Sequence, residues 1–196
     1  MSECDPATDR INSFALVGYI PGPLGDFISE LRTELVPGCV AQSHVSILPP
    51  RPLFVETSVA EQEIRSQLEG FSPVELEFGK LRLFEQTSVI YADLGKGRER
   101  LVTMHDALNR GSIEFDEPFP YHPHITLAQG VPAEELQAMY QVAIRRWKKG
   151  LPAGKFPIDS LTFVQNTAAN LWIDLADCRL NGAAINDTTS NTRLHP

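Results

Sequence analysis

The stretch that decides the fold is a tetrapeptide that occurs twice, as His44-Val45-Ser46-Ile47 and, 80 positions later, as His124-Ile125-Thr126-Leu127. In an extended strand, residues i and i+2 point to the same side, so the histidine and the hydroxyl residue share one face and the two apolar residues share the other. Each tetrapeptide is therefore predicted to be a strand that packs one face on a core and presents an imidazole and a hydroxyl on the other.

The same order of predicted elements surrounds both copies. Alternating apolar residues predict strands, and apolar residues at helical spacing predict helices that end at glycine or proline. In the first half the pattern predicts strand 14–20, helix 24–35, strand 44–48, helix 58–71 and strand 74–84. In the second half it predicts strand 89–94, helix 101–108, strand 124–128, helix 132–150 and strands 156–164 and 171–175. The helix after the first tetrapeptide is predicted to begin at a capping box, Ser58 with Glu61.

This repetition indicates an internal duplication with a period far longer than that of stacked solenoid repeats. We expect an α+β fold with two pseudo-symmetric lobes, each a mostly antiparallel sheet flanked by helices, that face each other across a central cleft. The lobes are predicted to correspond to repeats 13–85 and 87–177 within a single bilobal domain, residues 1–180. Residues 181–196 are polar and lack periodicity, which favours a disordered tail.

Composition limits the partners and the location. The chain has 196 residues, of which 42% are hydrophobic, and it carries a formal net charge of −8, which opposes binding to long duplex nucleic acid but allows a small anionic ligand. No apolar run is long enough to span a membrane, and the three cysteines lack the spacing of a zinc or redox site. We expect a soluble, cytoplasmic monomer that does not bind membranes.

The repeated polar face suits acid–base chemistry. Two imidazoles with an ordinary pKa of about 6.5 can act as a general base and a general acid near neutrality, and the two hydroxyls can donate to phosphate oxygens. Two alternatives stay open. The tetrapeptides could be ordinary strand residues inherited from the duplication, or His44, His122 and His124 could bind a metal, although no acidic residue or cysteine neighbours either motif.

Other charged or titratable residues have structural explanations. His105 lies between Leu101 and Leu108 on the apolar face of its helix and is predicted to be a packed core residue. His122 could orient His124 or simply belong to the preceding loop. The basic run 145–149 is predicted to complement the dipole of its helix rather than to bind nucleic acid.

With these two motifs the chain resembles the 2H phosphoesterases, and within them the RNA 2′,5′-ligase-like (LigT-like) branch. The resemblance covers about residues 13–177 and rests on His44-Val-Ser46-Ile-Leu, on Pro123-His124-Ile-Thr126-Leu-Ala, and on the duplicated element order. It implies a bilobal fold and a metal-independent enzyme without a cofactor. Such enzymes hydrolyse 2′,3′-cyclic phosphates or 2′,5′-linked RNA and nucleotide ends, and the resemblance also implies the reverse, 2′,5′-ligating direction.

By residue-wise transfer, His44 and His124 would be the catalytic pair, and Ser46 and Thr126 would hold the phosphate. The chain departs from the family where Gln129 replaces a basic residue after the second motif and where Ser46 replaces a more common threonine. Arg51 is therefore the candidate for the missing phosphate-binding cation, with a surface role as the alternative.

Tyr121, together with Phe119, is predicted to stack on a nucleobase, with packing beneath the loop as the alternative. For the protein as a whole, two functions compete with the hydrolase. One is a nucleotide-binding or RNA-end-binding module that uses the same cleft, and the other is a metal-dependent hydrolase.

Overall fold

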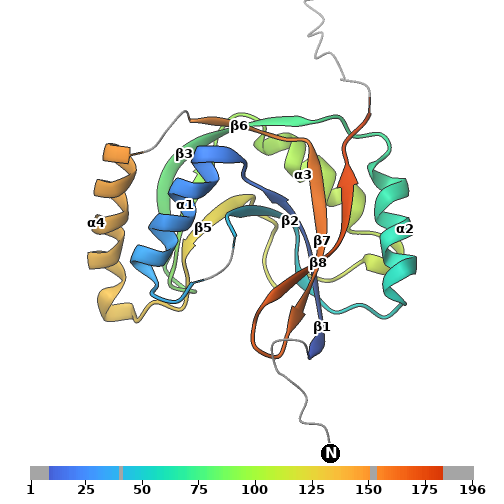
Figure 1. The fold of residues 1–196 in the computed structure, drawn as a ribbon, viewed down its shortest axis with the longest axis horizontal. Coiled ribbons are helices and arrows are strands. Elements are labelled where there is room, and N and C mark those ends of the chain that lie inside the picture. The colour runs from blue at the N-terminus through green and yellow to red at the C-terminus, as the bar shows by residue number, and fades with distance from the viewer. Residues whose placement is uncertain (1–8, 40–41, 151–153, 183–196) are drawn as a thin grey trace, which may run out of the picture.

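The computed structural model describes residues 9–39, 42–150 and 154–182, which form two four-stranded antiparallel sheets and four α-helices (Figure 1). The predicted α+β class is confirmed. The strands are β1 (Arg10–Tyr19), β2 (His44–Arg51), β3 (Val74–Phe84), β4 (Val89–Leu94), β5 (His124–Ala128), β6 (Lys155–Ile158), β7 (Ser160–Thr167) and β8 (Trp172–Arg179). The helices are α1 (Gly22–Leu35), α2 (Thr57–Leu68), α3 (Arg98–Leu108) and α4 (Ala133–Gly150), with a short 3₁₀ turn at Gly111–Ile113.

The two sheets do not correspond to the two halves of the chain. Sheet I has the strand order β2-β1-β7-β8, and sheet II has the order β5-β4-β3-β6. The last strand of the first repeat, β3, pairs with β4 in sheet II, and β7 from the second half pairs with β1 in sheet I. The first predicted lobe, 13–85, therefore contributes β3 to sheet II, and the second, 87–177, contributes β7 and β8 to sheet I. Backbone hydrogen bonds between these strands join the two repeats.

A single predicted strand, 156–164, also divides between the sheets. Its first part is β6, which pairs with β3, and its second part is β7, which lies between β1 and β8. Only Asp159 separates the two strands, and its carbonyl accepts a hydrogen bond from Leu180. Apolar residues alternate in both parts, as Phe156 and Ile158 in β6 and as Leu161 and Phe163 in β7, but the alternation shifts by one position at Asp159-Ser160. That shift coincides with the passage of the chain from one sheet to the other.

Strand β2 continues beyond the point at which prolines were expected to end it. The sequence predicted a stop at Pro49-Pro50, but β2 extends to Arg51. β2 is an edge strand of sheet I, where a missing backbone N–H need not interrupt pairing on the other side. Strand β5, which carries the second motif, is likewise an edge strand, of sheet II.

The helices join the two sheets from either side. α1 contacts β5 and α4, while α3 contacts β2 and α2 (Figure 1). Each helix that precedes a motif strand in the sequence thus packs on the motif strand of the other sheet. The predicted capping box is wrong: Glu56 is the N-cap of α2 without a side-chain cap, and Glu61 pairs with Arg65 instead.

One apolar cluster lies between these elements and includes residues from both sheets, such as Leu16, Leu76 and Ile90, none of which is exposed. None of the described helices has the length and hydropathy needed to cross a membrane. The predicted tail begins at Asn181, and residues 183–196 lie outside the part of the chain that the structure describes.

Candidate active site

The two motif strands show the same pattern of exposure. In β2, Val45 and Ile47 are fully buried, and in β5 the corresponding Ile125 and Leu127 are buried as well. The polar members of both strands are partly exposed; they are His44, Ser46, His124 and Thr126. The strand periodicity therefore places an imidazole and a hydroxyl on the open face of each strand, and the apolar partners anchor both strands in the common core.

The structure brings these two strands together, although they belong to different sheets. β2 and β5 are in contact with each other. The two imidazoles are close enough that a positive charge on His124 contributes to lowering the pKa of His44. Two proton-transfer groups and two hydroxyls therefore lie at one junction between the sheets.

Both imidazoles are oriented by the same backbone contact. Nδ1 of His44 lies 2.7 Å from the carbonyl oxygen of Gln42, and Nδ1 of His124 lies 2.6 Å from that of His122. A carbonyl only accepts, so each Nδ1 carries a proton and each neutral ring has its lone pair on Nε2. The duplicated contact thus assigns the same tautomer to both rings and leaves both Nε2 atoms for chemistry.

Burial keeps both rings neutral at pH 7. It lowers the pKa of His44 to about 4, although the hydrogen bond that the ring donates to the Gln42 carbonyl acts in the opposite direction, and the charge of the buried Arg32 lowers the pKa further. Burial also lowers the pKa of His124, although the hydrogen bond to His122 and the charge of Asp93 act in the opposite direction. The two rings therefore differ in their electrostatic surroundings, with a cation near His44 and an anion near His124.

Strand pairing places further polar groups beside the second motif. Asp93 on β4 is directly opposite His124, and Tyr91 is opposite Thr126. Arg82 on β3 is opposite Tyr91, and its Nε donates to Asp93 over 3.0 Å. Sequence reasoning missed Asp93 and Arg82, because only the register between β3, β4 and β5 brings them to His124.

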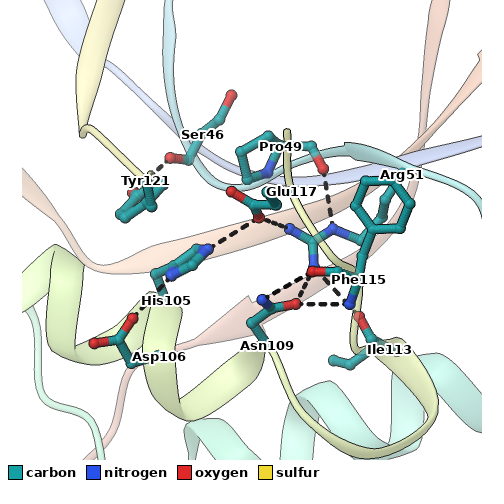
Figure 2. Close-up of polar contacts among 10 residues, drawn as sticks. All are labelled: Ser46, Pro49, Arg51, His105, Asp106, Asn109, Ile113, Phe115, Glu117 and Tyr121. Carbon is teal, nitrogen blue, oxygen red and sulfur yellow. Dashed lines mark hydrogen bonds and ion pairs between the residues drawn. The ribbon is translucent and has the colours of Figure 1, made fainter. Parts of the chain in front are cut away.

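The predicted phosphate-binding role of Arg51 does not fit its surroundings. The residue is only 3% exposed, and it pairs with Glu117. Its other nitrogens donate to the side chain of Asn109 and to the carbonyls of Pro49 and Ile113 (Figure 2). The guanidinium is therefore occupied by a buried internal network that attaches the end of β2 to the segment after α3.

Tyr121 also has a different role from the predicted nucleobase stacking. Its ring stacks on His105 at a centroid distance of 4.0 Å, and its hydroxyl donates to the carbonyl of Ser46 over 2.8 Å (Figure 2). One ring face is thus covered, and the hydroxyl joins the segment before β5 to β2. Phe119, its predicted companion, is 59% exposed.

His105 is a packed core histidine, as predicted, with 6% of its surface exposed. Burial lowers its pKa, but hydrogen bonds to Glu117 and Asp106 outweigh burial and raise the pKa overall. Among the residues that the structure describes, no group of three histidine, cysteine or acidic side chains is arranged to hold a metal ion. The three-histidine site that the sequence left open is therefore not assembled within them.

Two proteins named as phosphoesterases are similar to part of this chain. A protein of Staphylococcus haemolyticus named "Putative phosphoesterase" is 28% identical over 108 residues, which are 55% of this chain and 60% of that relative's length. A second, of Shouchella clausii and with the same description, is 30% identical over 133 residues, or 63% of this chain and 74% of its own.

The fold is also shared with a solved structure. The structure of Escherichia coli LigT in complex with 3′-AMP superposes with a TM-score of 0.59 at 15% identity and covers 87% of this chain and 98% of LigT. The model of the 2′-5′ RNA ligase superfamily matches residues 21–170, which include both histidine motifs and most of the two sheets. The chain therefore belongs to the 2′-5′ RNA ligase superfamily.

Proposed function

We propose that the protein is a metal-independent phosphodiesterase that hydrolyses 2′,3′-cyclic phosphates or 2′,5′-linked nucleotide and RNA ends. The observation that carries the proposal is the matched pair His44 and His124, whose Nδ1 atoms are both engaged by backbone carbonyls and whose Nε2 atoms are both left for proton transfer. The homologues of the same family that are named as phosphoesterases support the general reaction class.

The reaction needs one proton removed and one proton supplied. One neutral imidazole accepts a proton from water at Nε2 while the water oxygen attacks phosphorus. The other, protonated imidazole gives its Nε2 proton to the ester oxygen that leaves, so the P–O bond breaks without expelling an alkoxide. Because His44 and His124 lie on adjacent strands of different sheets, they can act from two sides of one phosphate.

Asymmetric charges suggest which ring does which step. Arg32 disfavours a proton on His44, whereas Asp93 favours one on His124. We therefore assign the base to His44 and the acid to His124 in hydrolysis, with the roles reversed in ligation. Ser46 and Thr126, two residues after each histidine on the same strand faces, would donate hydrogen bonds to the non-bridging phosphate oxygens.

The structure of Escherichia coli LigT, which has this fold, contains bound 3′-AMP, and this supports a nucleotide as the ligand. We extend that property to this chain as part of the proposal, with a small nucleotide or RNA end as the partner rather than long duplex nucleic acid. Location in a reducing cytoplasm, inferred from the scattered cysteines, stays a prediction.

The test is turnover of 2′,3′-cyclic AMP, 2′,5′-linked diadenosine and an RNA with a cyclic-phosphate end, after treatment with chelator. His44→Ala and His124→Ala should each lower kcat by about 10²- to 10⁴-fold, the usual contribution of a positioned acid or base. His195→Ala is the control, because it removes an imidazole outside both motifs, and it should leave kcat unchanged.

Unchanged turnover in either motif variant would contradict the proposal. If the wild-type protein binds these nucleotides through both histidines but hydrolyses none of them, the protein is a binding module. If chelator abolishes turnover and added zinc restores it, the protein is a metal-dependent hydrolase.

A further inference from the structure

The two copies of the motif differ in the groups that flank their histidines. The residue opposite the histidine on the neighbouring strand is Tyr19 for His44 and Asp93 for His124. The residue two positions before the histidine is Gln42 in the first copy and His122 in the second. The two motifs have the same backbone arrangement, but the side chains beside their histidines differ.

The flank of His124 contains a chain of polar contacts that begins and ends with an arginine. Nη2 of Arg98 lies 3.4 Å from Nδ1 of His122, and Nε2 of His122 lies 3.3 Å from Asp93. The other oxygen of Asp93 accepts from Nε of Arg82. Arg82 therefore contacts this carboxylate directly, whereas Arg98 is connected to it only through His122. Burial and both arginines lower the pKa of His122, so its ring is neutral at pH 7 and the cluster has a net positive charge.

Part of this positive charge is available for a ligand. The side chain of Arg82 is 56% exposed, and the terminal nitrogens of its guanidinium make no hydrogen bond within the described part of the chain. Arg98 is partly exposed, and the one hydrogen-bonding contact of its side chain among the same residues is that of Nη2 with His122. In a protein with a net charge of −8, such a concentration of positive charge beside a reacting phosphate favours a second anionic group.

The flank of His44 is different. Tyr19 donates to Asp174 over 2.6 Å. It also lines a cavity of about 230 Å³ whose walls combine apolar residues such as Ile20 and Pro21 with neutral polar groups and one acid, Asp26, and contain no basic side chain among the described residues. Arg32 is also near His44, but it is buried in α1 and 5% exposed. These groups suit hydroxyls and amines rather than a second phosphate. Of the two ends of the site, the one at His124 is therefore better suited to an anionic group of the ligand.

We propose that Arg82 and Arg98, held by Asp93 and His122, form a subsite for a second phosphate of the substrate, next to the phosphodiester that is cleaved. The inference rests on the proposed function, because it places the diester between His44 and His124. The substrate class that it selects is an RNA end or a nucleotide with a further phosphate, in preference to an unphosphorylated nucleoside cyclic phosphate.

The first experiment measures binding, which does not depend on turnover. Calorimetry compares adenosine 3′-monophosphate with adenosine 3′,5′-bisphosphate. The wild-type protein should bind the bisphosphate about tenfold more tightly, the size expected for one charge-assisted contact. Arg82→Gln and Arg98→Gln should each reduce this preference to less than threefold, and Arg82→Lys should retain part of it. The preference should also weaken as salt increases.

Arg65→Gln is the matched control, because Arg65 is also an exposed arginine paired with a carboxylate, Glu61, but lies on α2. It should leave the preference unchanged. The second experiment compares kcat/KM for adenosine 2′,3′-cyclic phosphate with and without a 5′-phosphate, and the arginine variants should lower the ratio of the phosphorylated to the unphosphorylated form.

Equal affinity of the wild-type protein for the two nucleotides, or a preference that survives both glutamine variants, would overturn the subsite. An arginine-dependent preference in a protein that hydrolyses neither cyclic phosphates nor 2′,5′-linked ends would uphold the subsite and refute the proposed hydrolase. The two inferences can therefore fail separately.

Discussion

The hydroxyl of Tyr121 donates to the backbone carbonyl of Ser46 across 2.8 Å, and this bond joins the segment that leads into the second motif to the strand that carries the first (Figure 2). His105 supports the Tyr121 ring from one side and contacts Glu117, which pairs with Arg51 at the end of β2. The segment before β5 is thus attached to β2 at two positions, Ser46 and Arg51. Side chains outside the two motifs therefore hold the two motif strands relative to each other.

Tyr121→Phe should lower kcat by about three- to tenfold with little change in KM. The variant keeps the ring and its stacking on His105 but leaves the Ser46 carbonyl without its partner, at a cost of roughly 1 kcal/mol in the free energy of unfolding. Because β2 then moves more freely relative to β5, His44 and His124 spend less time in the reactive arrangement. Steady-state kinetics and urea unfolding measure both effects.

Tyr140→Phe provides the matched control for that variant. The Tyr140 hydroxyl also donates to a carbonyl, that of Leu81, over 2.7 Å, but this bond joins α4 to β3, neither of which carries a motif. It should lower stability by a similar amount and leave kcat unchanged. If both phenylalanine variants reduce kcat equally, the Tyr121 bond has no special role in positioning.

Arg51→Met should destabilise the fold strongly and should not act through phosphate binding. Removing the cation leaves the carboxylate of Glu117, with 13% of its side chain exposed, beside His105 without its main partner. Breaking a buried pair from one side costs about 3 to 5 kcal/mol. Chemical denaturation measures the loss, and the double variant Arg51→Met with Glu117→Gln should recover part of it. Full stability of the single variant, with a raised KM, would instead restore the phosphate-binding role predicted from sequence.

The part of the fold and of the site that depends on local periodicity could be predicted from the sequence. The alternation of Val45, Ile47, Ile125 and Leu127 was sufficient to predict which faces of β2 and β5 are buried, because strand periodicity is a local property. Most helices and strands were found for the same reason. The duplication predicted two equivalent motif strands, and the structure shows them in contact.

What the sequence could not show depends on contacts between distant segments. The exchange of β3 and β7 between sheets follows from strand pairing, which the local pattern does not encode. Arg51 looked like a free cation because Glu117, its partner, lies in a loop 66 positions away. Arg82 contacts Asp93, which lies opposite His124 only because of the register of β3, β4 and β5. Each of these contacts is long-range and has no spacing signature.

The two motif histidines should titrate in a definite order, with His44 at lower pH than His124 and both below the ordinary value of about 6.5. NMR of the ring nitrogens during a pH titration measures the pKa of each histidine. The same spectra should show that Nε2 is the unprotonated nitrogen in both neutral rings. The active form has one proton on the pair, so kcat/KM should peak below pH 6.5 and fall on either side. A maximum above pH 7.5 would contradict the assigned surroundings.

The depressed pKa of His44 also makes the fold sensitive to acid. Its folded value is about 4, whereas the unfolded chain has the ordinary value near 6.5, so between these values the unfolded state binds the additional proton. The contribution of His44 to stability is therefore complete above about pH 6.5, falls as the pH decreases toward 4, and changes no further below that. The loss over this window should be about 1 to 3 kcal/mol.

His44→Gln isolates that contribution from those of other groups, including His105, whose raised pKa acts with the opposite sign. Urea unfolding at pH 7.5 and pH 4.5 gives the acid-induced loss of stability for the wild-type protein and for the variant. The variant should lose about 1 to 3 kcal/mol less, because glutamine does not titrate. Equal losses in the two proteins would mean that His44 accepts its proton as readily in the folded state as in the unfolded chain, and its burial would then not hold it in the neutral form that the proposed base requires.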